Sequence, residues 1–160
     1  MVPSLMDRET ASRTDDHQAL RLWLRLLTCS QLIEREVRAR LQGRFDTTLP
    51  RFDLMSQLWR YPAGLKMNEL SRHLMVTGGN VTGIVDLLEK DGQVERAAEP
   101  ADRRAYRVRL TRAGRKAFAE MARAHEAWIV ELLAGLSRRE HAEAFRLLGK
   151  LKQVTLEAKS

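Results

Sequence analysis

Positive charge is concentrated between positions 96 and 116. This stretch holds eight arginines and lysines but only two acids, Glu99 and Asp102, for a net charge of +6, whereas the whole chain carries +7. Clustered cations bind the phosphates of nucleic acids through their charge. A solvated charged surface has the same composition, so the place of the cluster in the fold decides between the two interpretations.

A second stretch, MVTGGNVTGIVDLLEK at positions 75–90, has residues suited to reading DNA bases. Asn80 can pair with adenine through two hydrogen bonds, and Thr82 can donate, accept or touch a thymine methyl. Gly79 and Gly83 lie four residues apart, so on a helix they share a face that can approach another surface closely. That surface is either a groove of DNA or a neighbouring helix, and the glycines alone favour neither.

Other chemistry for this glycine-rich stretch is excluded by spacing. A phosphate-binding loop needs Lys and Ser or Thr where Ile84 and Val85 stand, and no dinucleotide fingerprint is present. The histidines at positions 17, 73, 125 and 141 have no metal-binding spacing, and no nucleophile is paired with a base. We therefore expect no catalytic site, no metal and no cofactor.

The elements around these stretches follow from apolar spacing. A first helix is predicted from His17 to about Gly43, capped by Asp15 or Asp16, after a mobile tail at 1–16. Its first half is apolar on most faces, which predicts burial both inside the subunit and against a partner. Cys29 lies in this part, so a buried structural thiol is predicted, with a redox switch as the alternative.

The rest of the chain predicts short helices, a hairpin and two further helices. Thr111 should cap the first of the last two helices, which is interrupted near Gly135, and Ser137 with Glu140 should cap the second. The preceding elements are helices at 51–60, 67–75 and up to 91, strands at 92–100 and 106–111, and a turn at 100–105. This order predicts a mainly α winged helix-turn-helix with a two- or three-stranded β wing and long flanking helices.

Two segments resemble the MarR family of bacterial transcription regulators. They are ELSRHLMVTGGNVTGIVDLLEKDGQVER at 69–96 and DRRAYRVRLTRAG at 102–114, and the resemblance extends over about residues 17–155. It implies an obligate homodimer that binds double-stranded DNA at a palindromic operator. Residues 17–44 and 112–157 would form the helical dimerisation region, and residues 50–111 the DNA-binding domain.

The resemblance also implies which residues contact DNA. The wing arginine corresponds to Arg104, and Asp102 is placed to hold its guanidinium group. The complete predicted set is Thr77, Gly79, Asn80, Thr82, Asp102, Arg103 and Arg104. One position departs from the family pattern, because Leu87 stands where many members have arginine in the motif D-R-L-E.

Family members commonly respond to small anionic aromatic molecules, and this chain is most similar to the branch that regulates aromatic-acid degradation. The effector would be an aromatic acid or its CoA thioester, with Arg60 or His73 as donor to its carboxylate. The candidate ligand-binding residues are Trp23, Leu26, Ser30, Phe52, Met55, Trp59, Arg60 and His73. Most residues of these types belong to a protein core more often than to a ligand site.

The sequence thus predicts a ligand-released, homodimeric repressor. The alternatives are an architectural DNA-binding protein without sequence specificity and a redox-responsive regulator that uses Cys29. No apolar run has the length of a membrane span, and the N-terminus has no apolar core of signal-peptide length. We therefore expect a cytoplasmic protein without a membrane partner.

Overall fold

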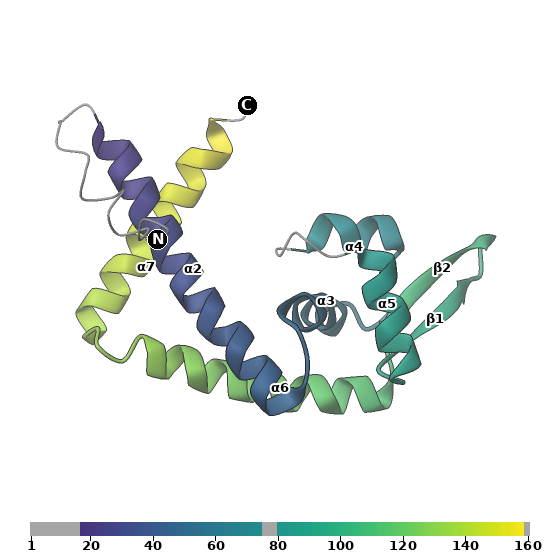
Figure 1. Ribbon diagram of the computed structural model, residues 1–160. Helices are drawn as coiled ribbons and strands as arrows, with labels where there is room; N and C mark the ends of the chain where they lie inside the picture. Colours follow the sequence, from purple (N-terminus) through teal and green to yellow (C-terminus); the bar gives the residue numbers. More distant parts are fainter. Residues whose placement is uncertain (1–16, 75–79, 159–160) are drawn as a thin grey trace, which may run out of the picture. The chain divides into compact units, whose positions relative to one another are not determined.

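The computed structural model describes residues 17–74 and 80–158, and of Arg103 the backbone alone. The chain divides into two compact units, one up to His125 and the other from Glu126 onward. Figure 1 shows six helices and a two-stranded sheet within the described residues. The fold is mainly helical with a small β wing, as the sequence predicts.

The first described helix, α2 (Gln18–Phe45), extends beyond its predicted end. Its C-cap is Asp46, whose φ of 49° is left-handed and whose backbone N–H donates to the carbonyl of Gln42 at 3.2 Å. The Asp46 carboxylate also accepts from the Gln42 side chain at 2.7 Å. Aspartate tolerates this backbone conformation, so the predicted end at Gly43 was wrong. The predicted caps Asp15 and Asp16 lie outside the described residues.

Three helices form the core of the first unit: α3 (Leu49–Arg60), α4 (Met67–His73) and α5 (Val81–Lys90). Thr48 caps α3, because its side chain accepts from the backbone N–H of Arg51. Each helix places apolar side chains inward at helical spacing. Those with at most 1% exposure are Leu54, Met55, Leu58, Leu70, Val85 and Leu88.

The wing consists of β1 (Val94–Glu99) and β2 (Asp102–Leu110), paired antiparallel with Val94 opposite Leu110. Leu65 forms an isolated antiparallel β-bridge with Val108, so one further residue pairs with β2 of the wing. Just before it, Gly64 has a φ of +90°, and a Cβ there would lie 2.6 Å from the carbonyl oxygen of Val108. The predicted turn at 100–105 was too long, since β2 already begins at Asp102.

Two helices follow the wing, α6 (Arg112–Leu132) and α7 (Arg138–Glu157). The cap at Thr111 is confirmed, since its hydroxyl accepts from the N–H of Gly114 at 3.0 Å. The capping box at the start of α7 is also confirmed, with Ser137 and Glu140 bonded in both directions. None of the helices in the described ranges is long and apolar enough to cross a membrane.

Candidate nucleic-acid interface

Helix α5 separates an apolar face from a polar one. Ile84, Val85 and Leu88 are buried, whereas Asn80 and Thr82 are exposed. Asn80 occupies the N-cap position, yet its side chain makes no capping hydrogen bond. Among the described residues the amide of Asn80 is thus not used to cap the helix, and it is of the type that pairs with adenine. The predicted neighbours Thr77 and Gly79 lie outside the described residues.

Gly83 has no close neighbour that explains the absence of a side chain. Among the atoms the structure describes, the three nearest to a Cβ built there all belong to the Asn80 side chain, the first at 3.6 Å. This is ordinary van der Waals contact. Close packing against another helix of the described chain therefore does not account for Gly83, and the explanation by approach to an external surface is favoured.

The hairpin carries less free charge than its sequence indicates. Arg107 pairs with Glu99 at 2.7 Å and Arg109 with Glu95 at 2.6 Å. Arg96 pairs with two acids of α5. The net charge of the stretch 96–116 overlooks carboxylates that lie outside it in sequence but beside it in space.

Arg96 links the wing to α5. Its guanidinium contacts the carboxylates of Asp86 and, at 2.7 Å, Glu89, and lies 5.4 Å from the centre of the Tyr106 ring. The hydrogen bond to Asp86 raises the pKa of Arg96 further above its usual range. Asp86 and Glu89 are three residues apart, so both face the same side of α5. These acids hold the helix against the wing.

Arg104 is exposed near the tip of the wing. The predicted contact between Asp102 and its guanidinium is wrong, because the Asp102 carboxylate instead accepts from the backbone N–H of Arg104 at 2.9 Å. A short acidic side chain commonly bonds the backbone two residues ahead, which fixes the turn. Asp102 therefore shapes the wing tip and leaves the Arg104 side chain available to a partner.

Comparisons with known proteins match this arrangement. The MarR family model matches residues 47–106. A crystal structure of a MarR family transcriptional regulator from Silicibacter pomeroyi is 34% identical, with 89% of this chain and 99% of that one covered and a TM-score of 0.75. The chain belongs to the MarR family. Members of this family are transcription regulators, not enzymes.

Two further relatives are similar over shorter parts. The wild-type MarR from E. coli, in its apo form, is 27% identical, with coverage of 79% of this chain and 94% of that one and a TM-score of 0.70. The "Transcriptional activatory protein BadR" of Rhodopseudomonas palustris is 30% identical over 99 residues, which are 61% of this chain and 56% of that protein. The chain spans about half the length of the first curated relatives it matches.

Leu87, the departure from the MarR motif D-R-L-E, is 45% exposed on α5. Its neighbours in the motif, Asp86 and Glu89, are the two acids that hold Arg96. The acids of the motif thus have a role inside this chain, whereas Leu87 lies at the surface. An arginine at this position would also lie at the surface, so the departure leaves the fold unchanged.

Of the predicted ligand residues of α3, Phe52 and Met55 lie in the core, whereas Trp59 is 38% exposed. Met55 is fully buried, and the Phe52 and Trp59 rings both contact Phe118, with centroids 5.4 and 5.3 Å apart. The ring of His125 lies 5.0 Å from that of Phe52, and burial lowers the pKa of His125. Sequence reasoning missed this histidine, because an isolated histidine in a helix gives no spacing signal.

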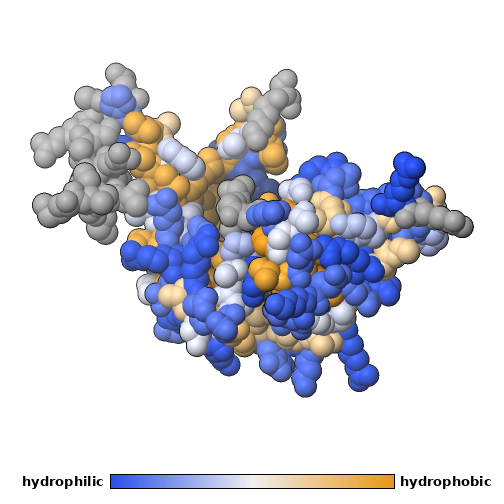
Figure 2. Space-filling model, turned by 45° about the vertical axis from the view of Figure 1, so that its right-hand side comes forward, coloured by the Kyte–Doolittle hydropathy of each residue, from blue (hydrophilic) through white to orange (hydrophobic). Residues whose placement is uncertain are grey.

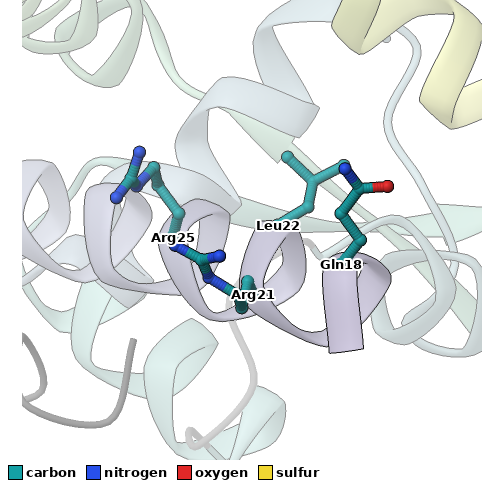
Figure 3. A pocket seen from close by; sticks show the side chains of 4 residues that line it. All are labelled: Gln18, Arg21, Leu22 and Arg25. Carbon is teal, nitrogen blue, oxygen red and sulfur yellow. The ribbon is translucent and has the colours of Figure 1, made fainter. Parts of the chain in front are cut away.

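The remaining ligand candidates lie on three helices. Trp23 is 54% exposed on α2, where Ser30 donates to the carbonyl of Leu26. Arg60 is exposed at the end of α3, and His73 packs on the Tyr61 ring. A cavity of about 160 Å³ at the start of α2 has none of the candidates in its described lining. Figure 3 shows the residues that line it, Gln18, Arg21, Leu22 and Arg25. Neither this cavity nor the one at the start of α7 has a residue of the predicted set in its described lining.

Cys29 is exposed, so the prediction of a buried thiol was wrong. Leu22 and Leu32 on the same helix are also exposed, by 59% and 46%. The apolar residues of this half of α2 are therefore not covered inside one described chain. Within the described chain Thr28 is the only buried residue of this half, so the predicted burial against a partner stays a prediction.

Proposed function

We propose that this MarR-family chain is a homodimeric DNA-binding transcription regulator. Helix α5 enters the major groove with Asn80 and Thr82 toward the bases, while the wing brings Arg104 to the adjacent minor groove. The observation that carries the proposal is the exposed polar face of α5 with Asn80 and Thr82. Arg96 holds this helix to the wing through Asp86 and Glu89. Thr77, Gly79 and Arg103 complete the proposed DNA-contacting set.

The proposed partner for α2 and α7 is a second copy of the chain. Large apolar side chains are exposed on α2 and on α7, including Trp23 at 54% and Phe145 at 83%. Figure 2 shows hydrophobic residues at the surface of the molecule. On each helix, an exposed apolar face of this kind supports an interface with another protein. A dimer would place two copies of α5 about 34–36 Å apart, one helical turn of DNA. Residues 17–44 and 112–157 are its proposed dimerisation region.

Selection from a pool of random DNA duplexes tests sequence-specific binding. We expect the selected sequences to be palindromes whose half-sites are centred about 10 base pairs apart, because each subunit offers one helix. Equal recovery of all sequences would support an architectural DNA-binding protein instead. Failure to retain any duplex would refute the proposed function altogether.

Replacement of the wing arginine tests how the chain is placed on the duplex. Arg104→Ala should weaken binding to the selected duplex while the dimer persists in sedimentation. Arg38→Ala is the matched control, since it removes an exposed guanidinium from α2 that is paired with Glu34. Equal affinities of Arg104→Ala and the unmodified protein would refute the wing assignment.

We further propose that the regulator is a cytoplasmic repressor released by an aromatic acid or its CoA thioester. Arg60 is an exposed cation next to the aromatic Trp59, which supports an anionic aromatic effector. A ligand that fits the released form better would shift the population away from the DNA-binding form. BadR is named as an activatory protein, so transcript levels after deletion decide the sign: a rise supports repression, a fall activation.

A thermal-shift screen tests the effector class, because a ligand that binds only the folded state raises the melting temperature. Aromatic acids and their CoA thioesters should stabilise the protein and lower its affinity for the selected duplex. Arg60→Gln should remove the response to the acids, whereas Arg146→Gln on α7 should keep it. No stabilisation by either compound class would refute the proposed effector.

A further inference from the structure

A shallow cavity lies beside the wing arginine, where the start of α4 meets the start of β2. Its volume is about 380 Å³. Residues from both elements line it: Lys66, Met67, Asn68, Arg104, Ala105 and Tyr106. Of these, only Arg104 belongs to the DNA-contacting set proposed above, so the cavity adds a second element to that surface.

The described lining of the cavity holds two cations and no carboxylate. Two acids adjoin it: Glu69 accepts from the backbone N–H of Lys66 at 2.7 Å and lies 3.9 Å from Arg107, and Asp102 accepts from the backbone N–H of Arg104 at 2.9 Å. The hydrogen bond from Lys66 lowers the pKa of Glu69, so this carboxylate stays ionised and bound to its own partners. Within residues 17–74 and 80–158, no carboxylate forms an ion pair within 4.0 Å with the Lys66 ammonium or the Arg104 guanidinium, although the charge of Lys66 also contributes to the lowered pKa of Glu69.

Asn68 supplies a third donor. Its side-chain oxygen accepts from the backbone N–H of Glu69 at 2.9 Å, which fixes the amide orientation. The amide NH2 group is then the part that remains to donate. An ammonium, a guanidinium and an amide around one cavity are donors of the kind that hold a phosphate oxygen.

From this arrangement we infer that the cavity binds a backbone phosphate of duplex DNA, next to the minor groove reached by the wing. This inference rests on the proposed DNA binding. The cavity is shallow and its cations are on different elements, so a strand passing across it fits better than an enclosed small molecule. Arg104 lines the cavity and is also the wing residue proposed to reach the minor groove. A phosphate bound in the cavity would therefore fix the position of the wing along the duplex.

Such a contact has an effect distinct from base reading. A phosphate contact adds affinity equally for all sequences and makes binding depend on salt. Removal of one contact lowers the slope of log affinity against log salt by about 0.9. The loss in affinity between 50 and 200 mM salt then becomes smaller by about 3.5-fold, since the salt ratio is raised to that power.

The first measurement is a salt titration of Lys66→Met on the selected duplex and on a scrambled one. We expect the shallower slope and an equal weakening on both duplexes. Lys152→Met on α7 is the matched control and should keep the slope of the unmodified protein. The melting temperature of each variant shows that it is folded, and Lys66→Gln, which also removes the charge, repeats the test if Lys66→Met is not.

The second measurement locates the phosphate. A neutral methylphosphonate is placed at each backbone position of the duplex in turn. At one position the methylphosphonate should weaken binding of the unmodified protein more than binding of Lys66→Met, because the variant has already lost one of the two cations that contact that charge. Stabilisation by inorganic phosphate that depends on Lys66, without such a position, would show a small-anion site and overturn the inference.

The outcomes separate this inference from the proposed function. Absence of DNA binding by the unmodified protein refutes both. Binding by the unmodified protein with an unchanged salt slope for Lys66→Met and Lys66→Gln refutes the phosphate site alone, and the proposed function stands.

Discussion

The winged part of the chain, which is α3, α4, α5 and the two strands, buries its apolar residues, whereas the outer helices α2 and α7 leave many of theirs exposed. In α3, α4 and α5 the inward positions are closed, with Leu54, Leu58 and Leu70 at 0% exposure. On α7 the apolar positions are open, with Phe145 at 83% and Leu148 at 49% exposure. Both regions have helical apolar spacing, so spacing predicts the helix but not what covers its face.

This difference separates apolar residues that are buried within one chain from those that would be buried only against a partner. The winged part has strands and helices on several sides of each core residue, whereas α7 buries none of its residues within the described chain. Exposed apolar surface costs free energy in water, about 25 cal/mol per Å². The comparison therefore predicts that substitutions in the two regions affect different equilibria, namely folding in the first and association in the second.

The largest expected effect is in the core of the winged part. Leu58→Ala should lower the free energy of unfolding by about 2–5 kcal/mol, because it leaves a cavity at a position with no exposure. Leu87→Ala on α5 is the control, with a change within about 0.5 kcal/mol, since Leu87 is 45% exposed. Urea denaturation measures both. Equal effects of the two variants would contradict the assigned core.

The next largest effect on stability is expected from substitutions at two separate glycines, Gly114 on α6 and Gly149 on α7. A Cβ at Gly114 would lie 1.8 Å from the backbone carbonyl oxygen of Gln93, so Gly114→Ala should cost about 1–3 kcal/mol of stability. A Cβ built at Gly149 on α7 would have no described neighbour within 4 Å outside its own helix turn. Gly149→Ala should therefore raise the stability of the protein by about 1 kcal/mol through helix propensity. Thermal denaturation should thus move in opposite directions, and a shift of both in the same direction would be inconsistent with this packing.

The fold could be predicted largely from sequence because its signals are local. Thr111 and the Ser137–Glu140 pair were correctly placed as caps, since a cap requires only a few residues in sequence. Helix ends were less accurate, because Asp46 ends α2 through a left-handed conformation that Gly43 would also suit. The strand at Asp102 was missed, since its pairing depends on β1 rather than on its own residues.

The candidate site was only partly predictable for a different reason. The exposed face with Asn80 and Thr82 follows from helical spacing alone. The pairing of Arg96 with Asp86 and Glu89 joins separate elements, so a count of charges along the sequence could not find it. The contribution of Lys66 and Asn68 likewise depends on α4 meeting β2.

The outer helices give an association effect. Phe145→Asp on α7 should weaken the proposed dimer by at least about tenfold, which corresponds to about 1.4 kcal/mol, because the charge would be buried on assembly. Sedimentation over a concentration range measures it. Lys152→Asp places a new carboxylate on the same helix and is the control. An unchanged monomer–dimer equilibrium for Phe145→Asp would show that α7 does not form the interface at this position.

The smallest effect concerns His125, packed on the Phe52 ring within the winged part. Burial lowers its pKa from an ordinary value of 6.5, so the folded chain takes up the proton at a lower pH than the unfolded chain. Stability is therefore complete above pH 6.5 and falls as the pH drops through 6.5 toward the folded pKa. Unfolding measured between about pH 5 and 7.5 should lose part of this dependence in His125→Gln. The matched change on α7, His141→Gln, should keep it, and an equal loss in both variants would remove the distinction between a packed histidine and an exposed one.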